Sequence, residues 1–294
     1  MKIAIIPNLT KKGAKECSEK VAKKLIELNA TPIFVEKTFI DVYGDKELDN
    51  SILIFKTIYG AVNNCDIVIT IGGDGTIIKT AKYTSEKDKP LLGINLGTLG
   101  FVAELEKDEL YKLECLVNGN YTVEERMMLK ATVKKERKTE SYYALNDINI
   151  SRGSLSRIIE LSVSLNDKEI TNYRADGLIF STPTGSTAYS LSAGGPVIEP
   201  TMKCVLLTPV CPHSLYSRSV LFSETSEITV MQKNYENTEV YLTVDGQKSI
   251  KLDYKDKIEI KKSHKFTKMI SINRKNFYRI LNDKLHERNI WKVC

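Results

Sequence analysis

The stretch that decides the fold reads Asp66-Ile67-Val68-Ile69-Thr70-Ile71-Gly72-Gly73-Asp74-Gly75-Thr76. Its apolar, β-branched first part predicts a buried strand over residues 66–71. The two adjacent glycines end that strand, and residues 76–83 can then form a helix. A strand, a tight glycine turn and a helix are typical of open α/β sheets, in which ligands bind beyond the carboxyl ends of the strands.

Short apolar runs alternate with a helical pattern throughout the first third of the chain. Further strands are predicted over residues 2–7, 32–35 and 91–95. A helix is predicted over 13–29, where Val21, Leu25 and Leu28 recur at helical spacing. The alternation predicts a Rossmann-like open parallel sheet covered by helices, in an α/β domain over residues 1–122.

The pattern changes near Tyr121, beyond which many short β-rich runs are separated by turn residues such as Asn166-Asp167 and Asp245-Gly246. These runs predict an all-β, sandwich-like domain over residues 123–272. The strands are expected over 128–134, 141–150, 157–165, 177–182, 205–209, 227–232, 239–244 and 257–261. The remaining residues, 273–294, are expected to return to the first domain, with a helix over 275–285.

The composition is that of an ordinary folded protein. The chain has 294 residues, of which 42% are hydrophobic and 27% charged, and its formal net charge is +6. The basic excess lies after Lys251 and lacks the interleaved aromatic residues of a single-strand binding platform. We interpret it as a solvated face and expect no nucleic-acid partner.

The six cysteines and three histidines are scattered, and no two cysteines have C-x-x-C spacing. This excludes a zinc motif and a disulfide framework of the usual kinds. No apolar run is long enough for a signal peptide or a membrane span. We therefore expect a reduced, cytoplasmic protein that is not attached to a membrane.

The glycine turn carries the sharpest chemical signal. Gly72 and Gly73 allow the backbone to approach a phosphate closely, and the following helix offers its N-terminal amides to an anion. Thr76 would cap that helix or touch a phosphate. A carboxylate repels phosphate, so Asp74 makes sense as a base for an acceptor hydroxyl or as a partner for a metal ion. The alternative is that Asp74 merely caps the helix.

A second glycine turn follows the next predicted strand and reads Gly93-Ile94-Asn95-Leu96-Gly97-Thr98-Leu99-Gly100-Phe101. Three glycines in so few residues fit a second loop that faces the ligand. A plain connection between two strands fits equally well.

Residues 174–196 contain many hydroxyl groups and glycines, one aspartate and one tyrosine. We prefer a nucleoside pocket, with Tyr189 as a stacking surface, over a loop without a ligand. Asn146-Asp147 offers an amide for an adenine edge and a carboxylate for a ribose diol, although the pair is also common in turns. Asp245-Gly246 favours a type I′ hairpin turn.

The order of these blocks resembles that of the NAD kinase family, from Asp66 to about Leu285. Lipid kinases of the diacylglycerol and sphingosine type share the pentapeptide from Gly72 to Thr76, and phosphofructokinases have similar signatures. Asn146-Asp147 and the block 181–196 indicate NAD kinase instead. Two further blocks add to the resemblance, Pro212-His213-Ser214-Leu215 and Asp245-Gly246-Gln247.

The resemblance implies transfer of a phosphate from ATP, with Mg²⁺ or another divalent cation, to the 2′-hydroxyl of the adenosine ribose of NAD. Inorganic polyphosphate is an alternative donor. Asp74 would be the base and Gly75 would approach NAD, while Gly72, Gly73 and Thr76 would contact phosphates. The site would lie between the two domains, with no protein metal ligand and no tightly bound organic cofactor. The NAD-binding set would be Asn146, Asp147, Asp176, Thr184, Thr187, Ala188, Tyr189, Ser190, Leu191, Ser192 and Gln247.

Three positions refine the resemblance. Arg157 matches a basic position that often reaches the ligand of a neighbouring subunit, which implies a homodimer or homotetramer with shared sites. Arg174 matches a basic position that accompanies preference for NAD over NADH. The usual family dipeptide is Asn-Glu, and the shorter Asp147 puts direct contact with the ribose in question.

Two other functions remain compatible with these residues. A non-catalytic NAD(P)-binding regulator would keep the pocket but would be expected to lose Asp74, which is present. A related lipid kinase should expose an apolar groove or an amphipathic membrane element.

Overall fold

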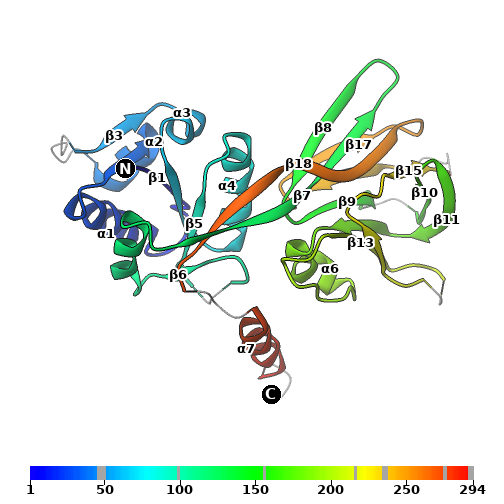
Figure 1. The fold of residues 1–294 in the computed structure, drawn as a ribbon. Helices are drawn as coiled ribbons and strands as arrows, with labels where there is room; N and C mark the ends of the chain where they lie inside the picture. The colour runs from blue at the N-terminus through cyan, green and yellow to red at the C-terminus, as the bar shows by residue number, and fades with distance from the viewer. Residues whose placement is uncertain are drawn as a thin grey trace. The chain divides into compact units, whose positions relative to one another are not determined.

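The computed structural model divides into two compact units, Met1–Glu125 with Thr267–Cys294, and Arg126–Phe266, here called the first and second unit (Figure 1). Thr98 and Leu99 of the second glycine turn, Leu215, and Lys275 in the expected last helix lie outside the described residues. The structure describes residues 1–44, 51–97, 100–154, 157–214, 217–233, 238–273 and 277–290, with side chains of the last helix to 284.

The first unit is built on parallel strands in the order β5–β4–β1–β2–β3. Their bounds are β1 Lys2–Pro7, β2 Thr31–Val35, β3 Leu53–Phe55, β4 Ile67–Gly72 and β5 Leu91–Asn95, and β6 (Leu105–Glu106) adds to β5. The chain builds outward from β1 in one direction and from β4 in the other. The strand order therefore reverses between β1 and β4, and such a reversal opens a crevice at the carboxyl ends of the two strands.

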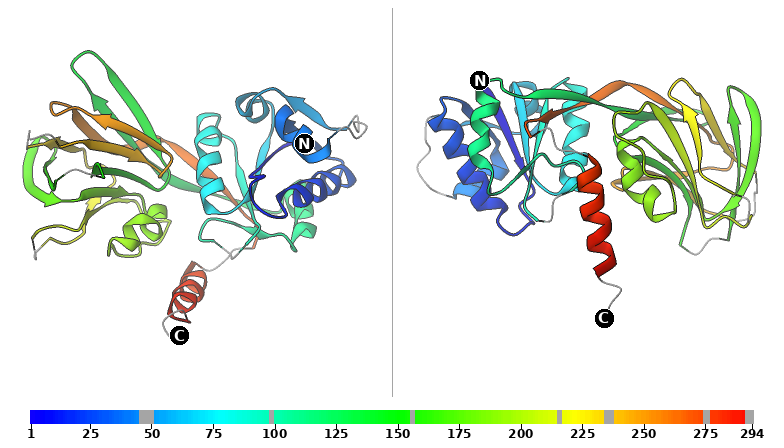
Figure 2. Two further views of the ribbon diagram at one scale, coloured as in Figure 1. Left: turned by 180° about the vertical axis from the view of Figure 1, so that it is seen from behind. Right: turned by 60° about the horizontal axis from the view of Figure 1, so that its bottom comes forward.

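Helices cover both faces of this sheet, with α1 and α4 on opposite sides (Figure 2). Every residue of β4 is buried, as expected for a strand covered on both faces. The helices of the unit are α1 Ala14–Glu27, α2 Glu36–Tyr43, α3 Ile58–Asn63, α4 Asp74–Glu86, η1 Leu110–Lys112, α5 Leu113–Val117 and α7 Phe277–Ile290.

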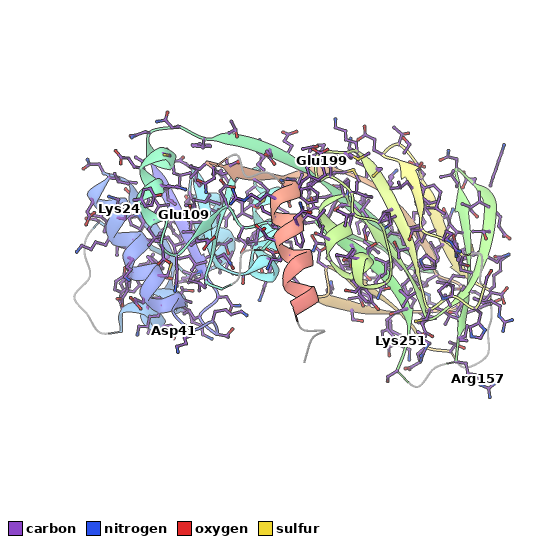
Figure 3. All side chains as sticks on the ribbon, turned by 90° about the horizontal axis from the view of Figure 1, so that it is seen from below. Lys24, Asp41, Glu109, Arg157, Glu199 and Lys251 are labelled. Carbon is purple, nitrogen blue, oxygen red and sulfur yellow. The ribbon has the colours of Figure 1, made fainter. Side chains whose placement is uncertain are left out.

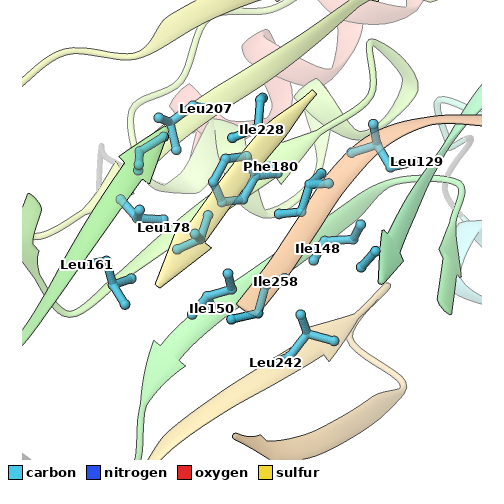
Figure 4. Close-up of a cluster of buried hydrophobic side chains, with 14 of the residues drawn as sticks. Leu129, Ile148, Ile150, Leu161, Leu178, Phe180, Leu207, Ile228, Leu242 and Ile258 are labelled. Atoms are coloured by element: carbon cyan, nitrogen blue, oxygen red, sulfur yellow. The ribbon is translucent and has the colours of Figure 1, made fainter. Parts of the chain in front are cut away.

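The second unit is a sandwich of two antiparallel layers. One layer has the order β14–β13–β12–β9–β16–β17, and the other contains β11–β10–β15–β18 with the hairpin β7–β8. Apolar side chains of both layers, such as Phe180, Leu161 and Ile228, form one buried core (Figure 4). The strands are β7 Thr122–Lys134, β8 Thr139–Ala144, β9 Asp147–Arg152, β10 Ile159–Leu165, β11 Lys168–Ala175, β12 Gly177–Ser181, β13 Cys204–Val210, β14 Val220–Ser223, β15 Ile228–Gln232, β16 Val240–Val244, β17 Lys248–Leu252 and β18 Lys257–Ser271. Between β12 and β13 lie η2 (Thr184–Thr187) and α6 (Tyr189–Ser192).

The predicted fold class, an α/β domain with an open sheet and a β-rich domain, is confirmed. The strand expected over 141–150 is two strands, β8 and β9, because the backbone of Leu145 and Asn146 bonds to a turn instead of to a partner strand. The strand expected over 257–261 extends to Ser271. Strand β17 was not predicted, since its residues, Lys248–Leu252, are mostly exposed and polar.

The Asp245-Gly246 turn between β16 and β17 is the predicted type I′ hairpin turn. Both residues have left-handed backbones, with φ of 50° and 64°. A type I′ turn requires positive φ at both central positions, which Asp and Gly tolerate.

No helix among the described residues is long and apolar enough to span a bilayer.

Replacement of Phe180 tests the sandwich core. Phe180 is fully buried, so Phe180→Ala leaves a cavity and should lower the free energy of unfolding of the second unit by about 3–5 kcal/mol. Ile170 on β11 is 46% exposed, so Ile170→Ala should stay within about 0.5 kcal/mol of the parent. Urea denaturation measures both, and equal small losses would contradict the core assignment.

Candidate active site

The residues that follow β1 and β4 meet where the strand order of the sheet reverses. Asn8 follows β1, and its backbone N–H donates to the carbonyl of Ile71 on β4 at 2.8 Å. Its side-chain amide donates to Oγ1 of Thr76 at 3.4 Å. The side chain of Asn8, just after β1, and the glycine turn after β4 therefore meet at the point where the strand order of the sheet reverses.

The glycine turn is tighter than the sequence indicated. Helix α4 begins at Asp74 with Gly73 in the cap position, so the expectations that the helix starts at Thr76 and that Thr76 or Asp74 caps it are wrong. A Cβ on Gly72 would lie 2.4 Å from Oγ1 of Thr76, which is closer than atoms can approach. Gly72 is thus required because the Thr76 hydroxyl folds back over the end of β4.

Asp74 is held by the second glycine turn. Its carboxylate accepts the backbone N–H groups of Phe101 at 2.9 Å and Val102 at 3.3 Å. A Cβ on Gly100 would lie 1.9 Å from Oδ1 of Asp74, so only glycine leaves room for the carboxylate. The described part of the second glycine turn therefore packs directly against the Asp74 carboxylate.

The start of α4 also offers hydrogen-bond donors. The N–H groups of Asp74 and Gly75 lie in the first turn of the helix and have no intrahelical acceptor. Gly75 is exposed, and a Cβ at this position would meet no atom within 4 Å. The turn therefore combines anion-binding amides with a carboxylate in one place.

In the second unit, Asp245 organises the Asn146-Asp147 pair. Its carboxylate accepts the N–H groups of Leu145, Asn146 and Asp147 at 2.9, 2.8 and 3.0 Å. The hairpin turn between β16 and β17 thus fixes the backbone where β9 begins. The sequence indicates a turn at Asp245 but not this contact, because the contact joins residues about a hundred positions apart.

Two carboxyl groups therefore meet in a buried place. Burial, and to a lesser extent the nearby Asp245 carboxylate, raise the pKa of the Asp147 carboxyl to about 7. Burial also raises the pKa of Asp245 to about 6, and its three backbone donors oppose that rise. Asp147 itself is only 6% exposed.

Asn146 presents an oxygen that lacks a partner. Its Oδ1 is buried and accepts no hydrogen bond from the described residues. The backbone around it is fixed, because Thr182 donates its N–H to the Asn146 carbonyl at 2.9 Å and its hydroxyl to the Leu145 carbonyl at 2.6 Å. A Cβ on Gly185 would lie 2.1 Å from that Asn146 carbonyl, so the turn η2 packs tightly against the pair. An unpaired buried acceptor is costly unless a ligand or water supplies a donor.

The turn that follows β12 contains most of the remaining predicted residues. Thr184 and Thr187 are buried, and Thr187 donates to the Thr184 carbonyl at 3.2 Å. Ser190 is fully buried and shares a hydrogen bond of 2.8 Å with Thr208 on β13. Tyr189 is 46% exposed and so offers a ring face. The other predicted members are partly or fully exposed: Ala188, Leu191, Ser192 and, on the Asp245 turn, Gln247.

A second group of predicted residues lies at the opposite ends of β9 and β12. In the register of these strands Asp147 faces Ser181, and Ser151 faces Gly177. Asp176 and Arg152, which flank the latter pair, are therefore roughly 17 Å from Asp147 at the usual strand rise.

Asp176 forms an ion pair with Arg152, with Nε and Oδ1 separated by 2.6 Å. Arg152 was not predicted, because only the strand register brings it to Asp176. Arg174 on β11 is exposed, and Arg157 is exposed at the periphery of the second unit (Figure 3). The structure does not bring these residues into contact with Asn146 and Asp147 within one chain.

No cluster of three or more His, Cys, Asp or Glu side chains suited to a metal ion occurs in the part of the chain that the structure describes.

Comparison with known families gives the same assignment for both halves of the chain. The ATP-NAD kinase N-terminal domain matches residues 3–121, and the ATP-NAD kinase C-terminal domain matches residues 145–272. An NAD kinase of Thermoanaerobacter sp. (strain X514) is 41% identical over 293 residues, which cover 98% of this chain and 99% of the relative. An NAD kinase of Natranaerobius thermophilus is 42% identical over 286 residues, 96% of this chain and 97% of the relative.

Solved structures agree with the fold. Yeast NADH kinase, crystallised with NADH, superimposes with a TM-score of 0.88 at 27% identity, over 97% of this chain and 87% of the other. An NAD kinase from Archaeoglobus fulgidus, in complex with ATP, has a TM-score of 0.75 at 23% identity, over 97% and 99% of the two chains. With both domains matched and relatives aligned over nearly their whole length, the chain belongs to the NAD kinase family of phosphotransferases.

Proposed function

We propose that Asp74 is the base that takes the proton from the 2′-hydroxyl of the adenosine ribose of NAD as a phosphoryl group is transferred to it. The observation that carries this role is the position of the Asp74 carboxylate. It lies at the first turn of α4 and is held by the backbone N–H groups of Phe101 and Val102. The amides at the start of α4, with Gly72, Gly73 and Thr76, form the phosphate-binding part of the site. Because the carboxylate is fixed before substrate binds, little reorganisation is needed for proton transfer.

The donor in this proposal is MgATP. The family to which both halves of the chain belong is described as ATP-NAD kinase, which supports a nucleotide donor. The divalent cation enters with the triphosphate and neutralises its charge, while the protein contributes positioning. Gly75 fits close approach of a substrate, since a Cβ at this position would meet no atom within 4 Å.

The acceptor part of the proposal rests on the Asn146-Asp147 pair. The unpaired Oδ1 of Asn146 accepts a hydrogen bond from a donor on the adenosine portion of NAD, and the Asp147 carboxyl accepts hydrogen bonds from the hydroxyl groups of its ribose. Yeast NADH kinase was crystallised with NADH, which supports a dinucleotide as acceptor. Thr184, Thr187, Ala188, Tyr189, Ser190, Leu191, Ser192 and Gln247 complete this part of the site.

The second group, at the far ends of β9 and β12, supports a shared site in a homodimer or homotetramer. By strand register Asp176 lies roughly 17 Å from Asp147, and Arg157 and Arg174 are exposed. In the proposed oligomer they reach NAD bound by a neighbouring copy, with Arg174 favouring NAD over NADH and Asp176 oriented by Arg152.

We also propose a cytoplasmic location, since the described cysteines are all free thiols.

Asp74→Asn should remove most turnover and leave the fold intact. Asn keeps the shape of the side chain but cannot take a proton, so kcat should fall by about 10²–10⁴-fold. NADP formation from NAD and MgATP, read with a coupled dehydrogenase, measures the loss. Asp41→Asn, at an exposed position on α2, is the matched control and should keep the parent rate. A kcat for Asp74→Asn equal to that of the control would remove Asp74 from this role.

Asp147 should make the ligand-free protein less stable as the pH rises. Its folded-state pKa is about 7, above the ordinary value of 3.8, so folding favours the protonated form. The contribution of protonated Asp147 to the free energy of unfolding is fully present below pH 4 and is lost as the pH rises through 7. Asp147→Asn cannot ionise, and should exceed the parent in free energy of unfolding at pH 8 by about 2–4 kcal/mol, but not at pH 4. Urea titrations at both pH values measure the difference, and a difference independent of pH would contradict it.

Asp245→Asn should weaken NAD binding through the Asn146-Asp147 backbone. An amide has one acceptor oxygen and turns an NH₂ group toward the three N–H donors, so at least one hydrogen bond is lost. The free energy of unfolding should fall by about 1–3 kcal/mol, and KM for NAD should rise more than kcat falls. Asp253→Asn, whose carboxylate is 74% exposed, is the control. An unchanged KM in Asp245→Asn would separate this carboxylate from NAD binding.

A further inference from the structure

The loop that holds Asp74 is itself held by the end of the chain. Glu104 closes this loop just before β6, and its N–H donates to the Gly93 carbonyl at 3.0 Å. Its carboxylate accepts the N–H groups of Ile272 and Asn273, at 2.8 and 2.5 Å, directly after β18 ends. These residues all belong to the first unit, and the contact joins segments about 170 positions apart in sequence.

Asn273 strengthens the same junction. Its side-chain amide donates to the Glu104 carbonyl at 3.2 Å, and its Oδ1 accepts Nζ of Lys112 at 2.6 Å. Glu104 is only 8% exposed, so its charge lies at a site where an uncompensated carboxylate would be costly. The two backbone donors supply that compensation, and in return the carboxylate fixes where the chain after β18 runs.

A second contact is made at the other end of the loop. The ring of Phe277, the first residue of α7, lies 6.4 Å from the ring of Phe101 between centroids, with the planes tilted by 47°. Phe101 is the residue whose N–H donates to Asp74 at 2.9 Å. The C-terminal segment therefore contacts the loop at Glu104 and again at Phe101, on both sides of Val102, the other amide that binds Asp74.

We propose that Glu104, Asn273 and Phe277 are positioning residues for phosphoryl transfer, which act through the amides of Phe101 and Val102 to fix the Asp74 carboxylate. The inference rests on the proposed role of Asp74 as base. The Gly100 backbone fits against the carboxylate with no spare room, so a loop that shifts must displace Asp74 or lose its hydrogen bonds. A displacement of about 1 Å at a reacting group can lower a rate by about 10²-fold.

The test compares Glu104→Ala with Glu104→Gln, and Phe277→Ala with Phe277→Leu, in the full-length protein. Gln keeps an oxygen acceptor and Leu keeps an apolar contact, so both conservative variants should recover most of the activity. The two Ala variants should lower kcat by about 10–100-fold, with KM for NAD within about twofold of the parent. Arg279→Ala, at an exposed position on the same helix, is the matched control and should keep the parent kcat.

A readout that does not depend on turnover comes from amide hydrogen exchange. The N–H groups of Phe101 and Val102 should exchange faster in Glu104→Ala and Phe277→Ala than in the parent and the Arg279→Ala control. Unchanged exchange in the two Ala variants would overturn the proposal, whatever their activity.

A double-mutant cycle separates this inference from the proposed function. If Glu104 acts through Asp74, Glu104→Ala should cause no further loss of rate in an Asp74→Asn background. An equal loss in both backgrounds would show that Glu104 acts elsewhere and would overturn the positioning role. If Asp74→Asn alone keeps the parent rate, the assignment of the base fails, while hydrogen exchange still reports whether the C-terminal segment holds the loop.

Discussion

The first unit depends on the contact in which the Asp74 carboxylate accepts two backbone N–H groups from the loop after β5. The strand order reverses between β1 and β4, where open α/β sheets bind ligands, but the reversal by itself carries no chemistry. The contact places a fixed carboxylate beside the amides of a helix start, where a phosphate would otherwise be the favoured anion. Gly72 and Gly100 are then required because each leaves space that a Cβ would fill.

The second unit uses the same device for a different purpose. There the Asp245 carboxylate accepts three backbone N–H groups and sets the course of Leu145, Asn146 and Asp147. In both units a carboxylate binds the main chain of a segment distant in sequence, and so defines the loop without relying on side-chain packing. Charge-assisted hydrogen bonds to backbone donors are stronger and more directional than apolar contacts, which suits positions that must be held accurately.

The sequence was sufficient for the fold class, since apolar periodicity and glycine turns depend on nearby residues. A family pattern also indicated Asp74 and Asn146 as residues of the site, and their roles stay proposals. The sequence was not sufficient for the contacts that hold them: the role of Asp245, the ion pair of Arg152 with Asp176, and the fit of Gly100 against Asp74. Each of these joins residues far apart in the chain, and neither propensity nor periodicity contains that information. The position of Thr76 inside α4 was missed because a helix that starts directly at a glycine turn lacks the usual capping residue.

The Asn146-Asp147 pair holds buried polar groups at a cost in stability. Asp147 is buried beside Asp245, and Oδ1 of Asn146 is buried without a partner among the described residues. An apolar pair at these positions would pack without either cost, so local stability does not explain the residues that occur there. A ligand that offers hydroxyl groups to the carboxylate and a donor to the amide would remove both costs on binding. The free energy withheld from folding would then appear as affinity, and the proposed binding of a nucleoside through its base and ribose hydroxyl groups follows from the unpaired Asn146 Oδ1 and the buried Asp147 carboxyl.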